Sequence, residues 1–300
     1  MGVIYLLFSK LSTIVKMIAM KKCGSIASGA RNSLIINLIR SVGCILVALT
    51  VALISGFSPM EPYGMLICIL SGIANAGLLF AWVLCAERGS LCTVEIFCMI
   101  GGVVLPMLIS PVLFKGETIT ALQWIGSVLL LPAAYCFSKK ANEKKASFTP
   151  SLLILLLTNC ISNALIFLTQ KYYTYYSLGS VSDFNLYTFI FCAATLAIAF
   201  LCISIIKPNR SEEKKEGFKL EKHIIVYISL AIGMLYAAQY FSTLASASLP
   251  SAYFFPLSYA IGMPLTFLTD ITVFKEKIKI SSLIGLMLVI LSVILIGLNI

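Results

Sequence analysis

The chain has 300 residues, of which 60% are hydrophobic and only 11% are charged. Roughly a quarter of the residues in a typical globular domain are charged, and a soluble fold of this length could not bury so much apolar surface. The composition therefore excludes an ordinary soluble protein and predicts an all-α integral membrane protein. The formal net charge of +10 does not indicate a nucleic-acid partner, because the basic residues gather in short segments between apolar runs.

Ten apolar runs follow one another, each near the roughly 20 residues that a spanning helix needs. They fall at 2–20, 33–55, 63–85, 91–113, 121–138, 151–171, 184–206, 224–246, 251–273 and 282–299. The first run carries Lys10 and Lys16 and lacks a small-residue cleavage site, so it predicts a helix rather than a cleavable signal peptide. A charged linker at 139–150 divides the helices into two sets of five, 1–138 and 151–300.

A short polar motif recurs at the same place in both sets. "FKGETITALQWIG" at 114–126 separates the fourth and fifth runs, and "FKEKIKISSLIG" at 274–285 separates the ninth and tenth. Further matches in the same order are Lys16 with Lys171, Gly24 with Gly179, Ala86 with Ala245 and Leu129 with Leu288. Because each copy has an odd number of helices, the sequence predicts two five-helix repeats of inverted orientation.

The motif at 114–126 predicts a tight hairpin between two helices. Thr120 and Gln123 have the spacing of a capping box at the start of the fifth helix. Ser281 is expected to cap the tenth helix, without a matching Gln or Glu. Glu117 is placed to favour the start of the helix that follows it through the helix dipole. A structural role for this motif is therefore favoured over a catalytic one.

Lysine and arginine concentrate in the odd-numbered loops. Basic residues cluster at 139–145 and 207–222, whereas the even-numbered loops hold only Lys115 and, at a helix end, Lys171. By the positive-inside rule, the odd loops face the cytoplasm and both ends of the chain face outside.

The ten helices and the polar motif resemble the drug/metabolite transporter superfamily, EamA-like branch. That family has a Gly-Glu turn, a following Thr and an Ile-Gly pair. Here these positions are Gly116-Glu117, Thr120 and Ile125-Gly126. The second copy keeps Glu276 and Ile284-Gly285 but lacks the Gly and the Thr. The stretch at 244–265, "LASASLPSAYFFPLSYAIGMPL", is similar to the family's small-residue turn and proline-containing helix.

The resemblance implies a metabolite or drug transporter with a central cavity between helices 1–4 and 6–9. Helices 5 and 10 would lie at the periphery. Members of the family usually keep both termini in the cytoplasm, so the charge bias of this chain and the resemblance give opposite orientations.

Polar residues inside the apolar runs are costly in a bilayer and are the candidate functional residues. The candidates are Lys10, Lys16, Arg40, Asn75, Glu95, Asn163, Lys171, Tyr236, Gln239 and Asp270. Lys16, Arg40 and Lys171 could instead extend to the lipid headgroups, and Asp270 could pair with Lys275 or Lys277. The amides, Asn159 included, could simply join helices. Lys10 and Glu95 lie deeper, which favours a site for solute. The tyrosines at 172–176 predict an aromatic belt at the membrane interface.

These features predict a secondary transporter of small polar metabolites, amino acids or organic acids, that works by alternating access and exports its solute from the cell. The excess of basic over acidic residues in the helices favours an anionic or zwitterionic solute, and Glu95 is the candidate for proton coupling. Efflux of cationic drugs, with Glu95 binding the cation, stays open. So does a non-transporting membrane scaffold subunit.

An enzyme is not expected, because the one histidine, His223, lies in a charged loop and no nucleophile motif is visible. Neither a cofactor nor a metal site is predicted, since the ten cysteines show no ligand spacing and read as small buried hydrophobes. The expected partners are the solute, a proton and the lipid of the cytoplasmic membrane, and a homodimer stays open.

Overall fold

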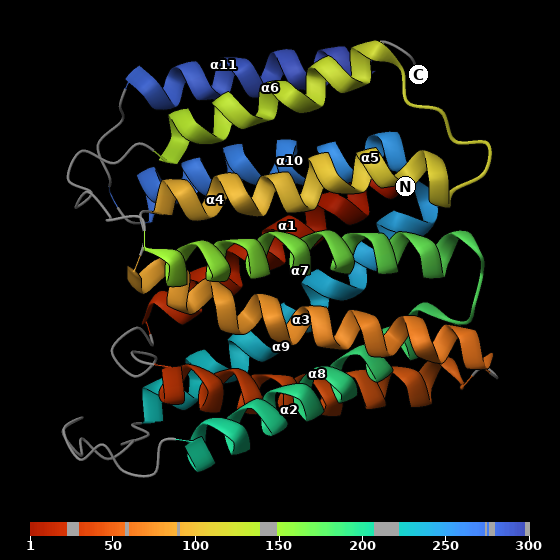
Figure 1. Ribbon diagram of the computed structural model, residues 1–300, viewed down its shortest axis with the longest axis vertical. Helices are drawn as coiled ribbons and strands as arrows, with labels where there is room; N and C mark the ends of the chain where they lie inside the picture. Colours follow the sequence, from red (N-terminus) through yellow and green to blue (C-terminus); the bar gives the residue numbers. More distant parts are fainter. Residues whose placement is uncertain are drawn as a thin grey trace.

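The computed structural model describes the chain apart from residues 23–29, 58–59, 89–90, 139–148, 207–221, 274, 276–279 and 298–300. The described part is all-α (Figure 1). Its helices are α1 (Gly2–Lys22), α2 (Ala30–Ser55), α3 (Pro62–Arg88), α4 (Leu91–Met99), the π-helix η1 (Ile100–Val104), α5 (Leu105–Leu113), α6 (Ala121–Ser138), α7 (Pro150–Tyr175), α8 (Val181–Ile206), α9 (Lys222–Ser248), α10 (Ser251–Thr272) and α11 (Ile280–Gly297).

Because α4, η1 and α5 follow one another without a break, the described residues form ten helical rods that lie side by side (Figure 1). Eight of them are long and apolar enough to cross a membrane. The apolar part of α6, Ala121–Cys136, is shorter, and α10 is not among the eight. Large apolar side chains such as Leu46, Ile205 and Met287 point outward, where lipid would cover them. The chain is therefore a multi-pass helical membrane protein, as its composition predicts.

The helix boundaries agree with the predicted ranges to within about four residues. The fourth predicted helix, 91–113, is confirmed and contains five residues of π-helix, which hydropathy does not reveal. Two local expectations, at Ser281 and Cys202, were wrong. Ser281 lies inside α11, which begins at Ile280, so it does not occupy the predicted cap position. Of the cysteines expected to be buried, Cys202 is exposed, whereas Cys44, Cys98 and Cys192 are buried as predicted.

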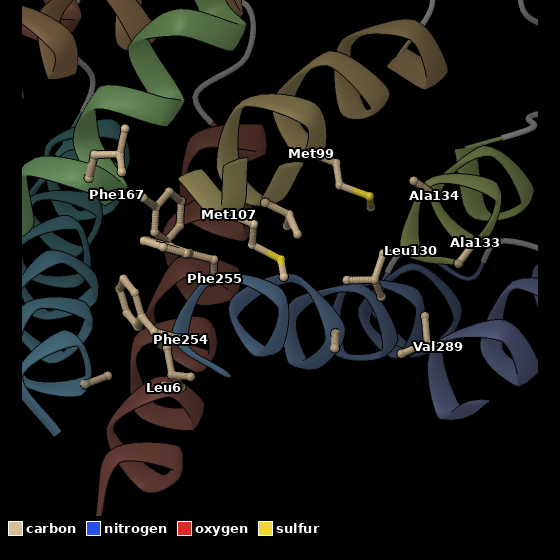
Figure 2. Packing of buried hydrophobic residues seen from close by; sticks show 14 of the residues in the cluster. Leu6, Met99, Met107, Leu130, Ala133, Ala134, Phe167, Phe254, Phe255 and Val289 are labelled. Atoms are coloured by element: carbon tan, nitrogen blue, oxygen red, sulfur yellow. The ribbon is translucent and has the colours of Figure 1, made fainter. Parts of the chain in front are cut away.

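Helices from the first half of the chain pack mainly on helices from the second half. The closely packed pairs are α1 with α9, α3 with α7, α2 with α8 and α6 with α11. The largest apolar cluster also spans both halves, with Leu6, Met107 and Leu130 from the first half and Phe167 and Phe254 from the second (Figure 2). The two halves are therefore interlocked, and the predicted division into domains 1–138 and 151–300 stays a prediction.

The Ile125-Gly126 pair marks a close approach between α6 and α11. A Cβ atom at Gly126 would lie 2.9 Å from the carbonyl oxygen of Ser292 and 2.9 Å from Ile296. In turn, the Ser292 hydroxyl donates a hydrogen bond of 2.6 Å to the carbonyl oxygen of Gly126. Glycine lets the two backbones meet, as small residues do at many helix interfaces in membranes.

The start of α1 and the end of α11 lie on the same side of the bundle (Figure 1). The start of α1 contacts the turn between α9 and α10, since Gly2 packs against Leu249. On this side also lie residues 114–120, which we call the clasp, and the turn between α7 and α8. We call this side the clasp face. The opposite side carries the helix ends that border the Lys- and Arg-rich loops, and those loops lie largely outside the described residues.

Candidate functional site

One face of α7 carries polar and aromatic residues along its C-terminal half, the half nearer the clasp face. Asn163, Phe167, Gln170 and Thr174 follow one another at intervals of three or four residues, so they lie on the same side of the helix. Lys171 borders this line and, like Asn163 and Gln170, is buried. Four other parts of the molecule meet this face in turn: the π-helical segment with α10, then α1, then α9, and finally the clasp.

A polar node joins α7 to α10 at the π-helical segment. The Asn163 side-chain nitrogen donates a hydrogen bond of 2.6 Å to the carbonyl oxygen of Cys98 and another to the Tyr259 hydroxyl. Tyr259 donates to the same carbonyl at 3.0 Å, and the Cys98 thiol donates to Asn159 Oδ1 at 3.0 Å. The structure thus brings the predicted residues Asn159 and Asn163 together with Tyr259, which the sequence did not single out.

Close packing accompanies the π-helix at this point. Gly101 lies against the backbone of Cys160, and Gly102 lies against the ring of Tyr259, so a Cβ atom at either position would overlap these groups. Such π-helical turns inside α-helices occur frequently at functional sites. The segment Ile100–Val104 therefore marks the polar node as a candidate site.

Lys10 reaches the same face of α7 from α1. Its ammonium lies 5.8 Å from the centre of the Phe167 ring and 5.5 Å from that of Tyr259. Each of the three residues lies eight positions from the clasp-face end of its helix, a depth of about 12 Å at the helical rise of ~1.5 Å per residue. Lys10 thus lies near the middle of the apolar core, where the described residues offer its ammonium no hydrogen-bond acceptor.

Two further cations lie toward the other side of the bundle. Arg40 is only 5% exposed and donates a hydrogen bond of 2.9 Å to Asn37 Oδ1. Asn37 is held in turn by a 3.2 Å bond to the carbonyl oxygen of Leu79. The half-buried Lys16 lies within electrostatic reach of both Arg40 and Lys10. The alternative that Arg40 extends to the headgroups is wrong, because its side chain is enclosed by protein.

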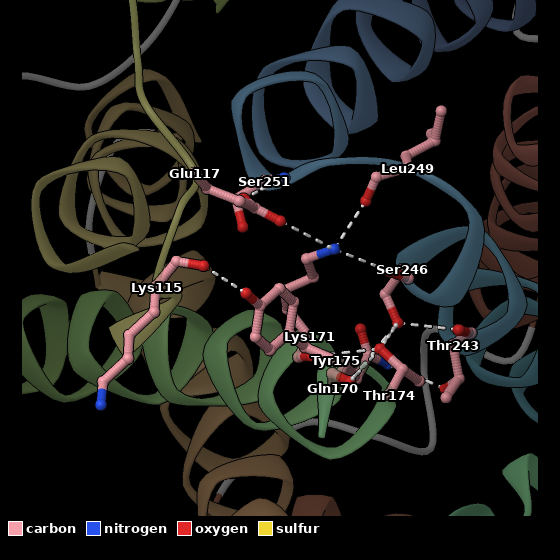
Figure 3. Close-up of polar contacts among 10 residues, drawn as sticks. All are labelled: Lys115, Glu117, Gln170, Lys171, Thr174, Tyr175, Thr243, Ser246, Leu249 and Ser251. Carbon is pink, nitrogen blue, oxygen red and sulfur yellow. Dashed lines mark hydrogen bonds and ion pairs between the residues drawn. The ribbon is translucent and has the colours of Figure 1, made fainter. Parts of the chain in front are cut away.

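Lys171 is a structural junction at the clasp face (Figure 3). Its ammonium forms an ion pair of 3.4 Å with Glu117 and donates to the carbonyl oxygens of Leu249 at 2.7 Å and Ser246 at 3.2 Å. It also lies 5.6 Å from the centre of the Tyr175 ring. Only 4% of Lys171 is exposed, so extension to the headgroups is again wrong. Because its donors have acceptors in the protein, Lys171 is better suited to joining helices than to binding solute.

Glu117 stabilises a different helix from the one expected. Its second carboxylate oxygen accepts a 2.7 Å hydrogen bond from the backbone nitrogen of Ser251, the first residue of α10. A carboxylate at this position is favourable because it meets the positive end of the helix dipole. The start of α6 is instead stabilised by the predicted capping box. There the Thr120 backbone nitrogen donates to Gln123 Oε1 at 2.9 Å, and the Gln123 backbone nitrogen donates to Thr120 Oγ1 at 3.4 Å.

The tyrosines at 172–176 do not form a simple interfacial belt. Tyr175 and Tyr176 donate hydrogen bonds to the carbonyl oxygens of Lys115 at 2.6 Å and Leu113 at 2.8 Å, which closes the end of α5. Tyr173 is fully buried, with its ring centre 4.7 Å from that of Phe184. These side chains therefore join α7 to the clasp and to α8.

Between the clasp and the centre, uncharged polar residues join α7, α8 and α9. Ser242 donates to Gln170 Oε1 at 3.1 Å, and Gln170 Nε2 donates to Thr243 Oγ1 at 3.5 Å. Asn185 Nδ2 donates to the same Thr243 hydroxyl at 3.4 Å. Sequence reasoning missed Gln170 and Asn185. The seven-residue spacing from Asn163 to Gln170 is a signal that could have identified the second of these amides on α7.

The remaining candidates are spread more widely. Asn75 donates to the carbonyl oxygen of Ser71 in its own helix at 2.9 Å. Tyr236 is buried beside Phe189, and Gln239 is half-buried on the same face of α9. Glu95 and Asp270 belong to α4 and α10, but their side chains lie outside the described residues.

A solved structure described as "Crystal structure of protein" is similar to the chain over its full length, with a TM-score of 0.75 and 16% sequence identity. The similarity covers 99% of this chain and 96% of that chain. No protein-family model and no curated protein matches the sequence. At this level of identity the likeness shows the fold alone. The chain thus shares a full-length multi-pass helical fold with a solved protein.

Proposed function

We propose that the chain is a secondary transporter of the EamA-like branch of the drug/metabolite transporter superfamily. It exports small polar metabolites, amino acids or organic acids, across the cytoplasmic membrane by alternating access of two inverted five-helix repeats. The observation that carries this proposal is the position of Lys10, whose ammonium lies between the Phe167 and Tyr259 rings near the middle of the apolar core.

The energetics of Lys10 favour an anionic or zwitterionic solute. A charged side chain at the centre of a bilayer costs at least about 2.5–3.5 kcal/mol, whereas contacts with aromatic rings return about 0.5–2 kcal/mol. An ammonium has three donors, and the described residues provide them with no acceptor. A solute carboxylate would supply acceptors and form short, charge-assisted hydrogen bonds. Retaining Lys10 at this depth is therefore best explained by solute binding.

The pattern of helix partners supports the inverted-repeat part of the proposal. With five helices per copy, α1 is the first and α3 the third helix of one copy, and α7 is the first and α9 the third of the other. Each first helix packs on the third helix of the opposite copy, as α1 does on α9 and α7 on α3. The second helices, α2 and α8, pack on each other, as do the fifth, α6 and α11. A twofold relation between the copies would produce this exchange.

Irregular helices around Lys10 support a moving site. The π-helix η1 adjoins the polar node, and α10 contains Pro256 and Pro264 on either side of Tyr259. Proline removes a backbone hydrogen bond inside a helix and favours bending there. Transporters commonly place such interrupted helices next to their binding sites.

Transport by purified protein in liposomes tests the proposal. The protein is offered a panel of amino acids and organic acids with and without a pH gradient. We expect the wild type to move at least one of them and Lys10→Ala to lose about tenfold or more of the rate. Lys115→Ala is the matched control, because the Lys115 side chain is exposed and points away from the Lys171 junction (Figure 3). Absence of any transport would favour a scaffold subunit, and a normal rate for Lys10→Ala would remove Lys10 from the site.

Glu95 stays the candidate for proton coupling, since it precedes Cys98 of the polar node by three residues. We expect Glu95→Gln to abolish accumulation driven by a pH gradient while it keeps solute exchange, because glutamine keeps the size and hydrogen bonding but carries no proton. Glu61→Gln, at an exposed position outside the helices, is the control. Wild-type accumulation by Glu95→Gln would exclude Glu95 as the coupling group.

A further inference from the structure

The facing sides of α8 and α9 carry four side chains with unused hydrogen-bonding atoms. These atoms are Asn185 Oδ1, Thr188 Oγ1, the Tyr236 hydroxyl and Gln239 Nε2. All four are buried, and none has a hydrogen-bond partner within the described parts of the chain. Buried polar atoms are nearly always paired, because an unpaired one costs about 1–3 kcal/mol in desolvation. We refer to the four residues as the amide–hydroxyl cluster.

Contacts between α8 and α9 and the spacing along each helix connect the members of the cluster. Asn185 Nδ2 donates to Thr243 Oγ1 at 3.4 Å, and Thr243 donates to the carbonyl oxygen of Gln239 one turn earlier at 2.9 Å. The Phe189 ring centre lies 6.3 Å from that of Tyr236, which is a second contact between the two helices. Thr188 lies one turn after Asn185 on α8, and Tyr236 lies one turn before Gln239 on α9, so the four residues border the contact between α8 and α9.

The cluster borders the same face of α7 as Lys10. The Ser9 hydroxyl donates a 2.8 Å hydrogen bond to the carbonyl oxygen of Ala238. Lys10 and Gln239 therefore each directly follow a residue of the contact between α1 and α9. Lys10 reaches the ring of Phe167, and Thr243, on the same side of α9 as Gln239, contacts Gln170 at 3.5 Å. Phe167 and Gln170 are one turn apart on α7. Lys10 and Thr243, which bonds to Asn185, thus reach neighbouring turns of α7, and a small molecule held at Lys10 would extend toward the cluster along α7.

The chemistry of the cluster indicates what it would bind. Asn185 Nδ2 donates to the carbonyl oxygen of Val181 at 2.7 Å, and a carbonyl can only accept, so Asn185 Oδ1 is the unused atom and an acceptor. Gln239 offers a donor, and the hydroxyls of Thr188 and Tyr236 can either donate or accept a hydrogen bond. A chemical group complementary to the cluster is therefore one that both donates and accepts hydrogen bonds.

We propose that the amide–hydroxyl cluster is the uncharged half of the solute site and selects carboxylates that also carry a carboxamide or a hydroxyl group. Lys10 binds the carboxylate, and the cluster binds the second group. This inference rests on the proposed transport function and names the solute class for it. It makes Thr188 and Tyr236 residues that determine specificity.

Two pairs of amino acids of nearly equal shape test the assignment. Asparagine and leucine differ in a carboxamide against two methyl groups, and threonine and valine differ in a hydroxyl against a methyl. We expect wild-type protein in liposomes to move asparagine and threonine at least about tenfold faster than leucine and valine, because a site with buried polar groups rejects analogues that leave them unpaired. In detergent, asparagine should raise the Tm more than leucine does at equal concentration.

Variants of the same shape locate the preference. Thr188→Val and Tyr236→Phe remove only a hydroxyl, and each should reduce the threonine-to-valine or asparagine-to-leucine ratio by about three- to tenfold, the effect of one hydrogen bond. Neither should lower the Tm without solute, since these hydroxyls have no protein partner among the described residues. Thr195→Val is the control in the same helix, because the Thr195 hydroxyl is bonded to the carbonyl oxygen of Phe191.

The outcomes separate this inference from the transport proposal. If wild-type protein moves leucine and valine as fast as asparagine and threonine, or moves only other solutes of the panel, the cluster assignment is wrong while transport stands. Unchanged ratios in both variants, or an equal loss for all four solutes with a lowered Tm, would also overturn it. If no solute of any kind moves or shifts the Tm, the transport function fails as well.

Discussion

Single charged residues in the helices of this protein have contrasting surroundings, which predict different roles. Lys171 and Lys10 both lie in apolar helices, but Lys171 is matched by Glu117 and two carbonyl oxygens, whereas Lys10 contacts two aromatic rings. A buried ion pair adds little net stability compared with an apolar pair, yet removal of one partner is strongly destabilising because the other is left uncompensated. Lys171 should therefore act on stability, and Lys10 on transport.

At Lys171 this reasoning gives a stability prediction. Lys171→Met should destabilise the protein by about 3–5 kcal/mol, since it leaves Glu117 and the carbonyl oxygens of Ser246 and Leu249 without their cation. Thermal unfolding in detergent measures the effect, with Lys115→Met as the control. The double variant with Glu117→Gln should lose less than the sum of the two single losses, because the residues are coupled. Simple additivity would show that the ion pair is not an interaction that matters for stability.

At the scale of helices, close packing depends on small residues at specific contacts. Gly126 lets α6 approach α11, and Gly101 and Gly102 let the π-helical segment meet α7 and α10. These contacts place the polar node against Lys10 on one side and keep the outer pair α6–α11 together on the other. Packing in the interior leaves little tolerance for added atoms.

The contact at Gly126 yields a matched pair of variants. Gly126→Ala should destabilise the protein by about 1–3 kcal/mol through overpacking, because its Cβ atom would press on the backbone of Ser292. Gly233→Ala in α9 has no atom within 4 Å of the added carbon and should be neutral or slightly stabilising, since alanine favours a helix by up to about 1 kcal/mol. Unfolding temperatures of the two variants provide the comparison. Equal temperatures would contradict the close contact.

At the scale of the whole molecule, the clasp face and the opposite face differ in charge. The clasp face carries Glu117, the tyrosines of α7, the start of α1 and the end of α11, while the Lys- and Arg-rich loops connect helices at the other face. The positive-inside rule then predicts that the clasp face is external. This orientation is the reverse of the one that the family resemblance implies.

Thiol labelling of intact cells decides between the two orientations. An impermeant reagent added outside should label Lys115→Cys, because Lys115 is exposed on the clasp face. The wild-type protein, whose exposed Cys202 lies toward the other end of α8, is the control for background labelling. Labelling of Lys115→Cys only after the cells are permeabilised would place the clasp in the cytoplasm.

Several features were predictable because they depend on local sequence or on the thickness of the bilayer. The spans follow from apolar runs of about 20 residues, since that length crosses the hydrocarbon core. The Thr120–Gln123 capping box is set by residues three apart, and its two hydrogen bonds are present. The depth of Lys10 also follows from its place in the first run. In each case the feature depends on residues close together in the sequence or on the thickness of the hydrocarbon core.

Other features were decided by tertiary structure alone, because they depend on which helices pack together. The partner of Glu117 is the start of α10, 134 residues away, rather than the adjacent α6. Tyr259 and Asn185 became candidates only when α10 and α8 were placed around Lys10 and α9. The π-helix has no local signature in the sequence, since it accompanies close contacts of Gly101 with Cys160 and of Gly102 with Tyr259. Hydropathy determines which segments enter the membrane, but apolar helices can pack in many arrangements of similar burial. The polar contacts between them exist only in the one that forms.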